Sequence, residues 1–284
     1  MADPQLFRPR NQFDAVMKDN TRQRAGARRF LIAVAISGLA STGVTPTNTA
    51  AQAVANDPGP SIPLPFAVGE KAEYQVKLGA ITVGSGVLEV VGMERANGHS
   101  TYRTRLHVKG GIPLARVDTR LESWIDAEGL FSRRFEQDQH EIRFERRRTY
   151  DFYPESRTYR RSDNGEIGRI PTDRPLDDVS FIFYTRTLPL RVGDTYTIPR
   201  YFKEDGNPVV IRVLRKETIE VPAGTFETIV VQPVIQTDGL FGEGGEAELY
   251  FTDDARRVLV QLRSSVPIVG SLSLYLRSYE PGGK

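Results

Sequence analysis

The chain has 284 residues, of which 38 are basic and 36 acidic, and it contains no cysteine. The absence of cysteine excludes thiol catalysis, disulfide bridges and thiolate metal sites. Residues 1–53 hold seven basic and three acidic residues, so the remainder has 31 basic and 33 acidic residues and a net charge near −2. The basic excess therefore belongs to the N-terminal segment, and nothing in the rest indicates a nucleic-acid partner.

Residues 1–53 have the pattern of a secretory signal peptide. Four arginines between residues 22 and 29 precede the uncharged run 30–40, and a small and polar stretch ends at Ala51-Gln52-Ala53. The apolar run is shorter than the about 20 apolar residues that a membrane-spanning helix needs. We therefore predict cleavage after Ala53 and an exported, periplasmic protein with no transmembrane anchor after cleavage. The export route stays open between the general secretory and the twin-arginine pathway. The start of translation stays open between Met1 and Met17.

Residues 54–65 are rich in proline and glycine and predict a linker. Beyond the linker, apolar residues recur at every second position, which is typical of half-buried strands. The clearest alternating stretches are residues 74–78, 102–108 and 272–276. Turn sequences such as Asn97-Gly98 separate the strand patterns and leave no room for crossover helices, so we predict a largely antiparallel sheet.

One segment, residues 175–188, breaks this alternation. It begins with Pro175 and the acid pair Asp177-Asp178, which are typical of a helix start. Apolar residues then follow at helical spacing, as at Val179 and Ile182. The segment predicts a short helix between two β-rich halves.

Two pairs of similar sequences indicate that these halves are related. Phe66–Glu70 recurs as Leu190–Asp194, and Leu121–Asp126 recurs as Ala247–Thr252, at offsets of 124 and 126 residues. We predict an internal duplication of residues 66–165 and 190–280, with the helix at the junction. Chance recurrence of strand starts in a β protein is the alternative explanation.

The predicted fold is one mostly β domain over residues 66–284. We expect curved antiparallel sheet forming a barrel-like or half-barrel shell of two related halves, with a two-sheet sandwich as the alternative. The buried face is expected to hold Tyr74, Val76, Leu78, Leu106, Trp124, Phe226, Ile229, Val231, Tyr250, Leu272 and Leu274.

The chain also resembles a family of exported bacterial proteins that is known only as a domain of unknown function. The phrases that carry the resemblance, in chain order, are Pro65–Glu70, Asp178–Arg186, Val221–Phe226 and Tyr250–Asp254. It covers about residues 65–279 and departs at Val258-Leu259-Val260, where a proline is expected. The resemblance implies a periplasmic, mostly β protein and supplies no catalytic residues to transfer.

No motif in the sequence predicts catalysis. The three histidines, His99, His107 and His140, lack partners at metal-ligand spacing, and adjacent acids on a strand point to opposite faces. No serine lies in a G-x-S-x-G elbow, and Walker, H-E-x-x-H and G-x-G-x-x-G sequences are absent. We therefore predict no catalytic residue, no metal site and no cofactor.

The richest stretch for binding is residues 143–153, where arginines alternate with aromatic residues. If it forms one strand, Phe144, Arg146, Arg148 and Tyr150 share a face that can bind an anionic or sugar group by bidentate contacts and stacking. We predict these four residues and Trp124 as ligand-binding. The alternative is an edge hairpin whose arginines pair with nearby acids.

Three functions are compatible with this sequence. The first is a non-enzymatic binding or carrier protein for a lipid or other hydrophobic ligand of the cell envelope. The second is a structural or assembly factor that binds an envelope protein. The third is a hydrolase whose site is not legible in the sequence.

Overall fold

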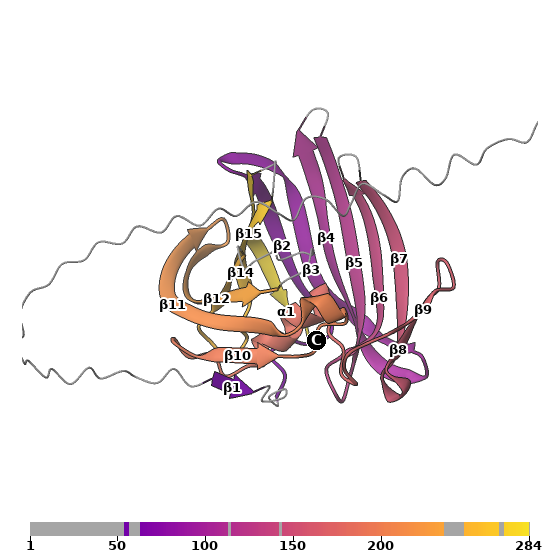
Figure 1. Ribbon diagram of the computed structural model, residues 1–284. Helices are drawn as coiled ribbons and strands as arrows, with labels where there is room; N and C mark the ends of the chain where they lie inside the picture. The colour runs from indigo at the N-terminus through magenta and orange to yellow at the C-terminus, as the bar shows by residue number, and fades with distance from the viewer. Residues whose placement is uncertain are drawn as a thin grey trace, which may run out of the picture. The chain divides into compact units, whose positions relative to one another are not determined.

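The computed structural model describes residues 54–56, 63–112, 115–141, 144–235, 247–266 and 270–283, so the predicted signal peptide lies outside the described residues. Within these residues all fifteen strands belong to one sheet (Figure 1), in the order β1-β10-β11-β12-β13-β14-β15-β2-β3-β4-β5-β6-β7-β8-β9. Every neighbouring pair is antiparallel except β1 with β10, which is parallel.

The strands form two runs along the chain, one on each side of the helix. The N-terminal strands are β1 (Val54–Asn56), β2 (Glu70–Leu78), β3 (Ile81–Ala96), β4 (His99–Ile112), β5 (Ala115–Asp126), β6 (Ser132–Glu141), β7 (Phe144–Tyr153), β8 (Thr158–Arg161) and β9 (Ile167–Arg169). After helix α1 (Asp178–Arg186) come β10 (Thr195–Ile198), β11 (Val209–Val221), β12 (Gly224–Val234), β13 (Glu248–Thr252), β14 (Leu259–Val266) and β15 (Gly270–Pro281). Two short 3₁₀ turns lie at Pro154–Ser156 and Glu204–Gly206.

The sheet is built from two meanders that meet in its middle. The C-terminal strand β15 pairs with β2, from Leu272 opposite Leu78 to Pro281 opposite Glu70. The described strands leave β1 and β9 as the two edges, so the sheet is not closed. The predictions of a mostly β, antiparallel fold with one short helix are confirmed, and the single sheet replaces the two-sheet alternative.

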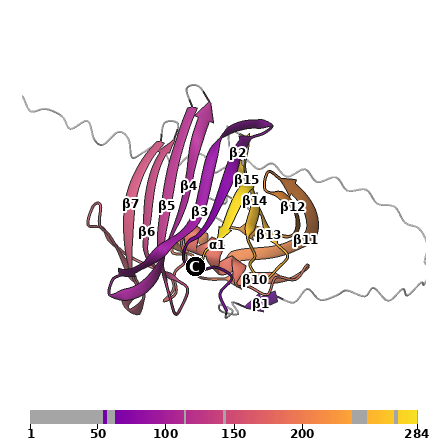
Figure 2. The ribbon, with the colours of Figure 1, turned by 180° about the vertical axis from the view of Figure 1, so that it is seen from behind.

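One face of the sheet, called the inner face below, carries the hydrophobic core. Figures 1 and 2 show the sheet curving around α1, which lies between the strands β10 to β12 and the strands β4 to β7. The helix packs on β4 and β5. Core side chains contributed by both meanders include Tyr74, Leu106, Val231 and Leu274, each at most 2% exposed.

Helix α1 begins where the sequence indicates. The side chain of Asp177 accepts hydrogen bonds from the backbone N–H groups of Val179 and Ser180, and the Ser180 hydroxyl accepts one from the Asp177 N–H. This capping box satisfies N–H groups that the first turn leaves free. All nine helical residues are buried, and the last, Arg186, forms an ion pair with Glu70 at 2.6 Å.

The two halves repeat the same backbone turn before their first strands. In the first, the N–H of Gly69 donates to the carbonyl of Val90, and in the second the N–H of Gly193 donates to the carbonyl of Val213, both at 2.9 Å. Both glycines have a positive φ, of 82° and 93°, which side chains with a Cβ rarely adopt. This recurrence supports the predicted duplication, which stays a prediction.

Two predicted core residues lie on the outer face. Trp124 and Tyr250 are buried, at 6% and 1% exposure, but neither belongs to the inner-face core. The reason is strand alternation, because Ser123 points inward to Asp177 and therefore directs Trp124 outward. The prediction that both aromatic rings line the buried inner face is wrong.

The other predicted core residues are found where expected or nearly so. Tyr74, Val76, Leu106, Ile229, Val231 and Leu274 are buried, whereas Leu78, Phe226 and Leu272 are half-buried. The predicted linker also differs in part, because its first residues, Val54–Asn56, form the edge strand β1 beside β10. Pairing at a free strand edge satisfies backbone groups independently of side-chain pattern, so the sequence does not indicate it.

Candidate functional site

Strand β7 presents the predicted ligand-binding arginines to the inner face. Alternate residues of a strand share a face, so Arg146 and Arg148 lie on the same side as Tyr150 and Phe152, which belong to the core. Both arginine side chains are half-buried. The backbone of Phe144 has the same parity, and its side chain lies outside the described part of the chain.

Two glutamines on the neighbouring strand β6 complete a polar row. Gln137 pairs with Arg148 and Gln139 pairs with Arg146 across the β6–β7 ladder, so all four side chains leave the same face. Gln137 is only 5% exposed. The Oε1 atoms of both glutamines are buried and have no hydrogen-bond partner among the described residues. We call Gln137, Gln139, Arg146 and Arg148 the inner polar row.

Sequence reasoning missed these two glutamines. The pairing of the two strands would have indicated them, because a hairpin between residues 132–141 and 144–153 places Gln137 opposite Arg148. The sequence of β6 alone gives no such signal, because apart from Phe135 its residues are polar on both faces of the strand.

Tyr150 belongs to the packed floor next to this row. Its ring lies 5.3 Å from that of Phe202 and 6.2 Å from that of Phe152, and its side chain is 5% exposed. The Tyr150 hydroxyl accepts a hydrogen bond from Nη1 of Arg148 at 3.5 Å. Tyr150 therefore holds one arginine of the row but offers little surface of its own.

Trp124 is not brought to this site. On the outer face its ring lies between the guanidinium groups of Arg103, at 5.3 Å, and Arg134, at 5.7 Å. Its indole N–H donates to Glu94 at 2.9 Å. The ring is thus enclosed by cation–π contacts and an ion-pair network on the opposite side of the sheet from the inner polar row.

A serine and acid cluster lies under α1 and is sealed. Ser123 and Ser132 both donate to Oδ2 of Asp177, which is fully buried. Burial raises the pKa of Asp177 to about 6, against the opposing effect of the serine and backbone hydrogen bonds. With no exposed atom and both carboxylate oxygens engaged in capping and serine contacts, this cluster has a structural role.

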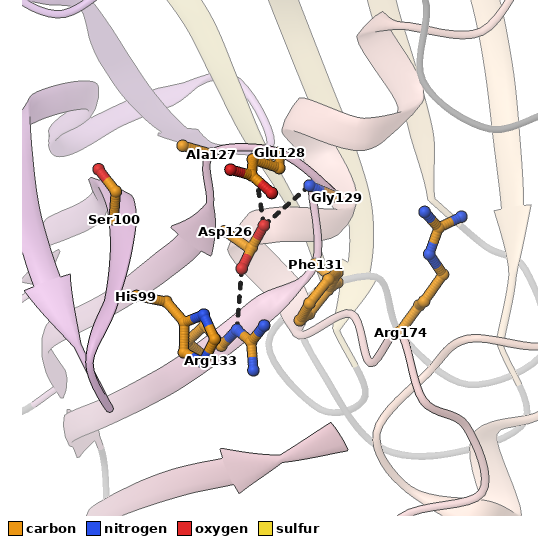
Figure 3. A pocket seen from close by; sticks show the side chains of 9 residues that line it. All are labelled: His99, Ser100, Asp126, Ala127, Glu128, Gly129, Phe131, Arg133 and Arg174. Atoms are coloured by element: carbon orange, nitrogen blue, oxygen red, sulfur yellow. Dashed lines mark hydrogen bonds and ion pairs between the residues drawn. The ribbon is translucent and has the colours of Figure 1, made fainter. Parts of the chain in front are cut away.

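Figure 3 shows a cavity of about 600 Å³ at the ends of the strands, where the β3–β4 and β5–β6 turns meet. It is lined by His99, Ser100, Asp126, Ala127, Glu128, Gly129, Phe131, Arg133 and Arg174. His99 and Ser100 are consecutive strand residues and project to opposite faces. The carboxylate of Asp126 accepts hydrogen bonds from the N–H groups of Glu128 and Gly129 and from Nε of Arg133. His99, Ser100 and Asp126 therefore do not form a nucleophile–base–acid array.

Over the described ranges, no three or more histidine or acidic side chains are grouped so that they could hold a metal ion. In the same part of the chain, no helix is both long and apolar enough to cross a membrane. The pairs His107–Asp118 and His140–Asp138, at 2.8 and 3.1 Å, lie in the exposed or half-exposed ion-pair rows of β4 to β6.

Comparison with known proteins gives a family but no activity. The model of a family described as "Protein of unknown function (DUF3108)" matches residues 73–277. Among solved structures, the chain is similar to a beta-barrel-like protein of domain of unknown function DUF1849 from Brucella abortus, with 12% identity, a TM-score of 0.48, and coverage of 77% of this chain and 99% of that one. A Bacteroides fragilis protein with a YmcC-like fold matches with 14% identity, a TM-score of 0.28, and coverage of 76% and 98%. A search of curated proteins finds no match.

Proposed function

We propose that this chain, which belongs to the DUF3108 family of proteins of unknown function, is an exported protein that binds an amphipathic envelope ligand on its inner face without transforming it. The observation that carries the proposal is the pair of buried Oε1 atoms of Gln137 and Gln139. They have no hydrogen-bond partner within the described part of the chain and lie in one row with two arginines. The signal-peptide pattern of residues 1–53 supports export.

The energetics of the row favour a ligand. A buried acceptor without a donor costs about 1–3 kcal/mol, so two adjacent ones destabilise the fold considerably unless a bound molecule supplies N–H or O–H groups. Arg146 and Arg148 add donors that suit a carboxylate or phosphate oxygen. A polar headgroup bearing both donors and an anionic oxygen matches this set.

Apolar side chains adjoin the row. On β5, Thr119 pairs with Gln139 and Leu121 pairs with Gln137, and on β4 Val108 and Leu106 continue the same two cross-strand lines. The inner face therefore changes from polar to apolar within two strands. A molecule with a polar head and a hydrocarbon part would meet both surfaces, which is why we place a hydrophobic envelope ligand here.

The test is mass spectrometry of lipids that copurify with the chain. We expect a bound lipid whose recovery falls at least fivefold in the double variant Arg146→Ala, Arg148→Ala. The matched control is Arg147→Ala, which removes an exposed arginine of the same strand from the outer face and should leave recovery unchanged. Equal recovery from all three proteins, or no lipid in the parent protein, would contradict the proposal.

A second candidate, an assembly factor that binds an envelope protein, is favoured by a different observation. The inner face around α1 is filled by a continuous core that includes Phe135, Phe152, Phe183 and Phe202. A filled interior leaves binding to the surface and the rims. Affinity capture from envelope extracts separates the assembly factor from the lipid-binding protein. An assembly factor should capture a specific protein, and the Arg146→Ala, Arg148→Ala double variant should no longer capture it.

A further inference from the structure

A second region with binding chemistry is the cavity in Figure 3, which shares no residue with the inner polar row. Its walls come from five places: the start of β4, the end of β5, the β5–β6 turn, the start of β6, and the segment before α1. Three of its lining side chains are basic, namely His99, Arg133 and Arg174, and Phe131 is its aromatic one.

Arg133 is fixed in place within this cavity. Its Nε donates to Asp126 at 2.9 Å and its Nη1 donates to Glu155 at 2.8 Å, and the guanidinium lies 4.6 Å from the centre of the Phe131 ring. The side chain is 7% exposed. Among the described residues, Nη2 makes no hydrogen bond, so one end of a rigid donor fork remains available.

Arg174 contributes a second guanidinium to the same cavity. Its backbone is held on both sides, because its N–H donates to Thr172 Oγ1 and its carbonyl accepts from Nε of Arg200, at 3.1 and 2.9 Å. The side chain is exposed and has no ion pair within the part of the chain that the structure describes. The backbone contacts therefore fix the position of Arg174, and its exposed guanidinium remains accessible to a ligand.

The two acidic residues of the cavity, Asp126 and Glu128, differ in whether neighbouring groups engage their charge. Burial opposes ionisation of Asp126, but the hydrogen bonds from Gly129, Arg133 and Glu128 outweigh it and keep its pKa below the usual value. Its charge is thus engaged by these groups. Glu128 is exposed and forms no ion pair among the described residues.

We propose that this cavity binds a phosphate group, carried either by a soluble ester or by a phospholipid. The oxygens of a phosphate are arranged tetrahedrally and can accept from Nη2 of Arg133, from Arg174 and from His99, whereas the two oxygens of a carboxylate lie in one plane. The volume of about 600 Å³ leaves room for an organic part beside the phosphate. Glu128 opposes a multiply charged anion, so a phosphate diester, which carries a single charge, suits the site best. A monoester suits it better below its second pKa of about 6, where it also carries a single charge.

The experiment titrates the full chain at about pH 5.5, where a phosphate monoester is mainly singly charged. Glycerol 3-phosphate is measured by calorimetry and phosphatidylglycerol vesicles by sedimentation. We expect Arg174→Ala to weaken binding at least tenfold and Glu128→Gln to strengthen it severalfold, with melting temperatures unchanged because both side chains are exposed. Arg277→Ala removes an exposed arginine of β15 and should change nothing.

The two arms identify the source of the phosphate. Binding of glycerol 3-phosphate that depends on Arg174 supports a soluble ester, and binding of vesicles alone that depends on Arg174 supports a phospholipid headgroup. No binding of either probe, or an equal loss in Arg174→Ala and Arg277→Ala, would overturn the proposal.

Discussion

The buried carboxyl of Asp177 makes the stability of this chain depend on pH in an unusual direction. Asp177 caps α1 and is fully buried, and burial raises its pKa to about 6 from the 3.8 of an unperturbed aspartate. Between these two values the folded chain holds a proton that the unfolded chain releases. The stabilisation from this proton is therefore complete below about pH 3.8 and is lost as the pH rises through about 6.

The size of the effect follows from the same two values. A tenfold change in proton affinity corresponds to about 1.4 kcal/mol, so the complete effect is about 3 kcal/mol, of which about 2 kcal/mol falls between pH 7 and pH 4.5. The amide side chain of the variant Asp177→Asn resembles the protonated carboxylic acid, and asparagine remains a good N-cap residue. The variant should thus lack this particular pH dependence.

The assay is urea unfolding at pH 7 and pH 4.5, followed by the fluorescence of Trp124, the only tryptophan in the chain. Other acids titrate equally in both proteins, so the informative quantity is the difference in unfolding free energy between them. As the pH falls from 7 to 4.5, we expect the unfolding free energy of the parent chain to increase by about 2 kcal/mol relative to that of the Asp177→Asn variant. A difference that stays constant with pH would refute the reasoning.

Three further predictions concern the buried pair, the inner polar row and metals. Glu70→Gln leaves Arg186, whose side chain is 1% exposed, without its carboxylate partner. Urea unfolding should show that the unfolding free energy falls by about 3–5 kcal/mol. The control Lys71→Ala breaks the exposed pair with Glu73 and should have no measurable effect. A normal stability of Glu70→Gln would show that another group compensates Arg186. In lipid-stripped protein, Gln137→Leu should raise the unfolding free energy by about 1–3 kcal/mol because it removes a buried acceptor without a donor; a lower stability would mean that the amide is already satisfied. Chelation with EDTA should leave the melting temperature unchanged, and a shift of several degrees in calorimetry would count against the prediction that the chain holds no metal.

Much of the fold was accessible from local patterns. Alternation at Tyr74, Val76 and Leu106 predicts strands with one buried face, and the acid pair Asp177-Asp178 predicts the start of α1. These features depend on neighbours within a few residues, so a sequence records them directly. The helical spacing around Val179 gave the helix correctly, although it did not indicate that all nine residues would be buried.

The failures depend on contacts that are distant in sequence. A tryptophan on a strand favours the core side by hydrophobicity, yet Trp124 lies outward because Ser123 meets Asp177, which is 54 residues away. Arg103 and Arg134 then bury the ring from the outer side. The candidate site shows the same limit, since Arg146 and Arg148 are legible in β7 but their glutamine partners emerge only when the β6–β7 register is known.

The seam between β15 and β2 has a consequence for the kinetics of folding. Within each meander, neighbouring strands are consecutive in the chain, but the strands that join the meanders are almost 200 residues apart, as with Leu78 and Leu272. The seam can therefore close only after β15 has been synthesised. Until then the chain consists of two half-sheets, each with an unpaired strand at the future seam, and a chaperone would find these edges exposed.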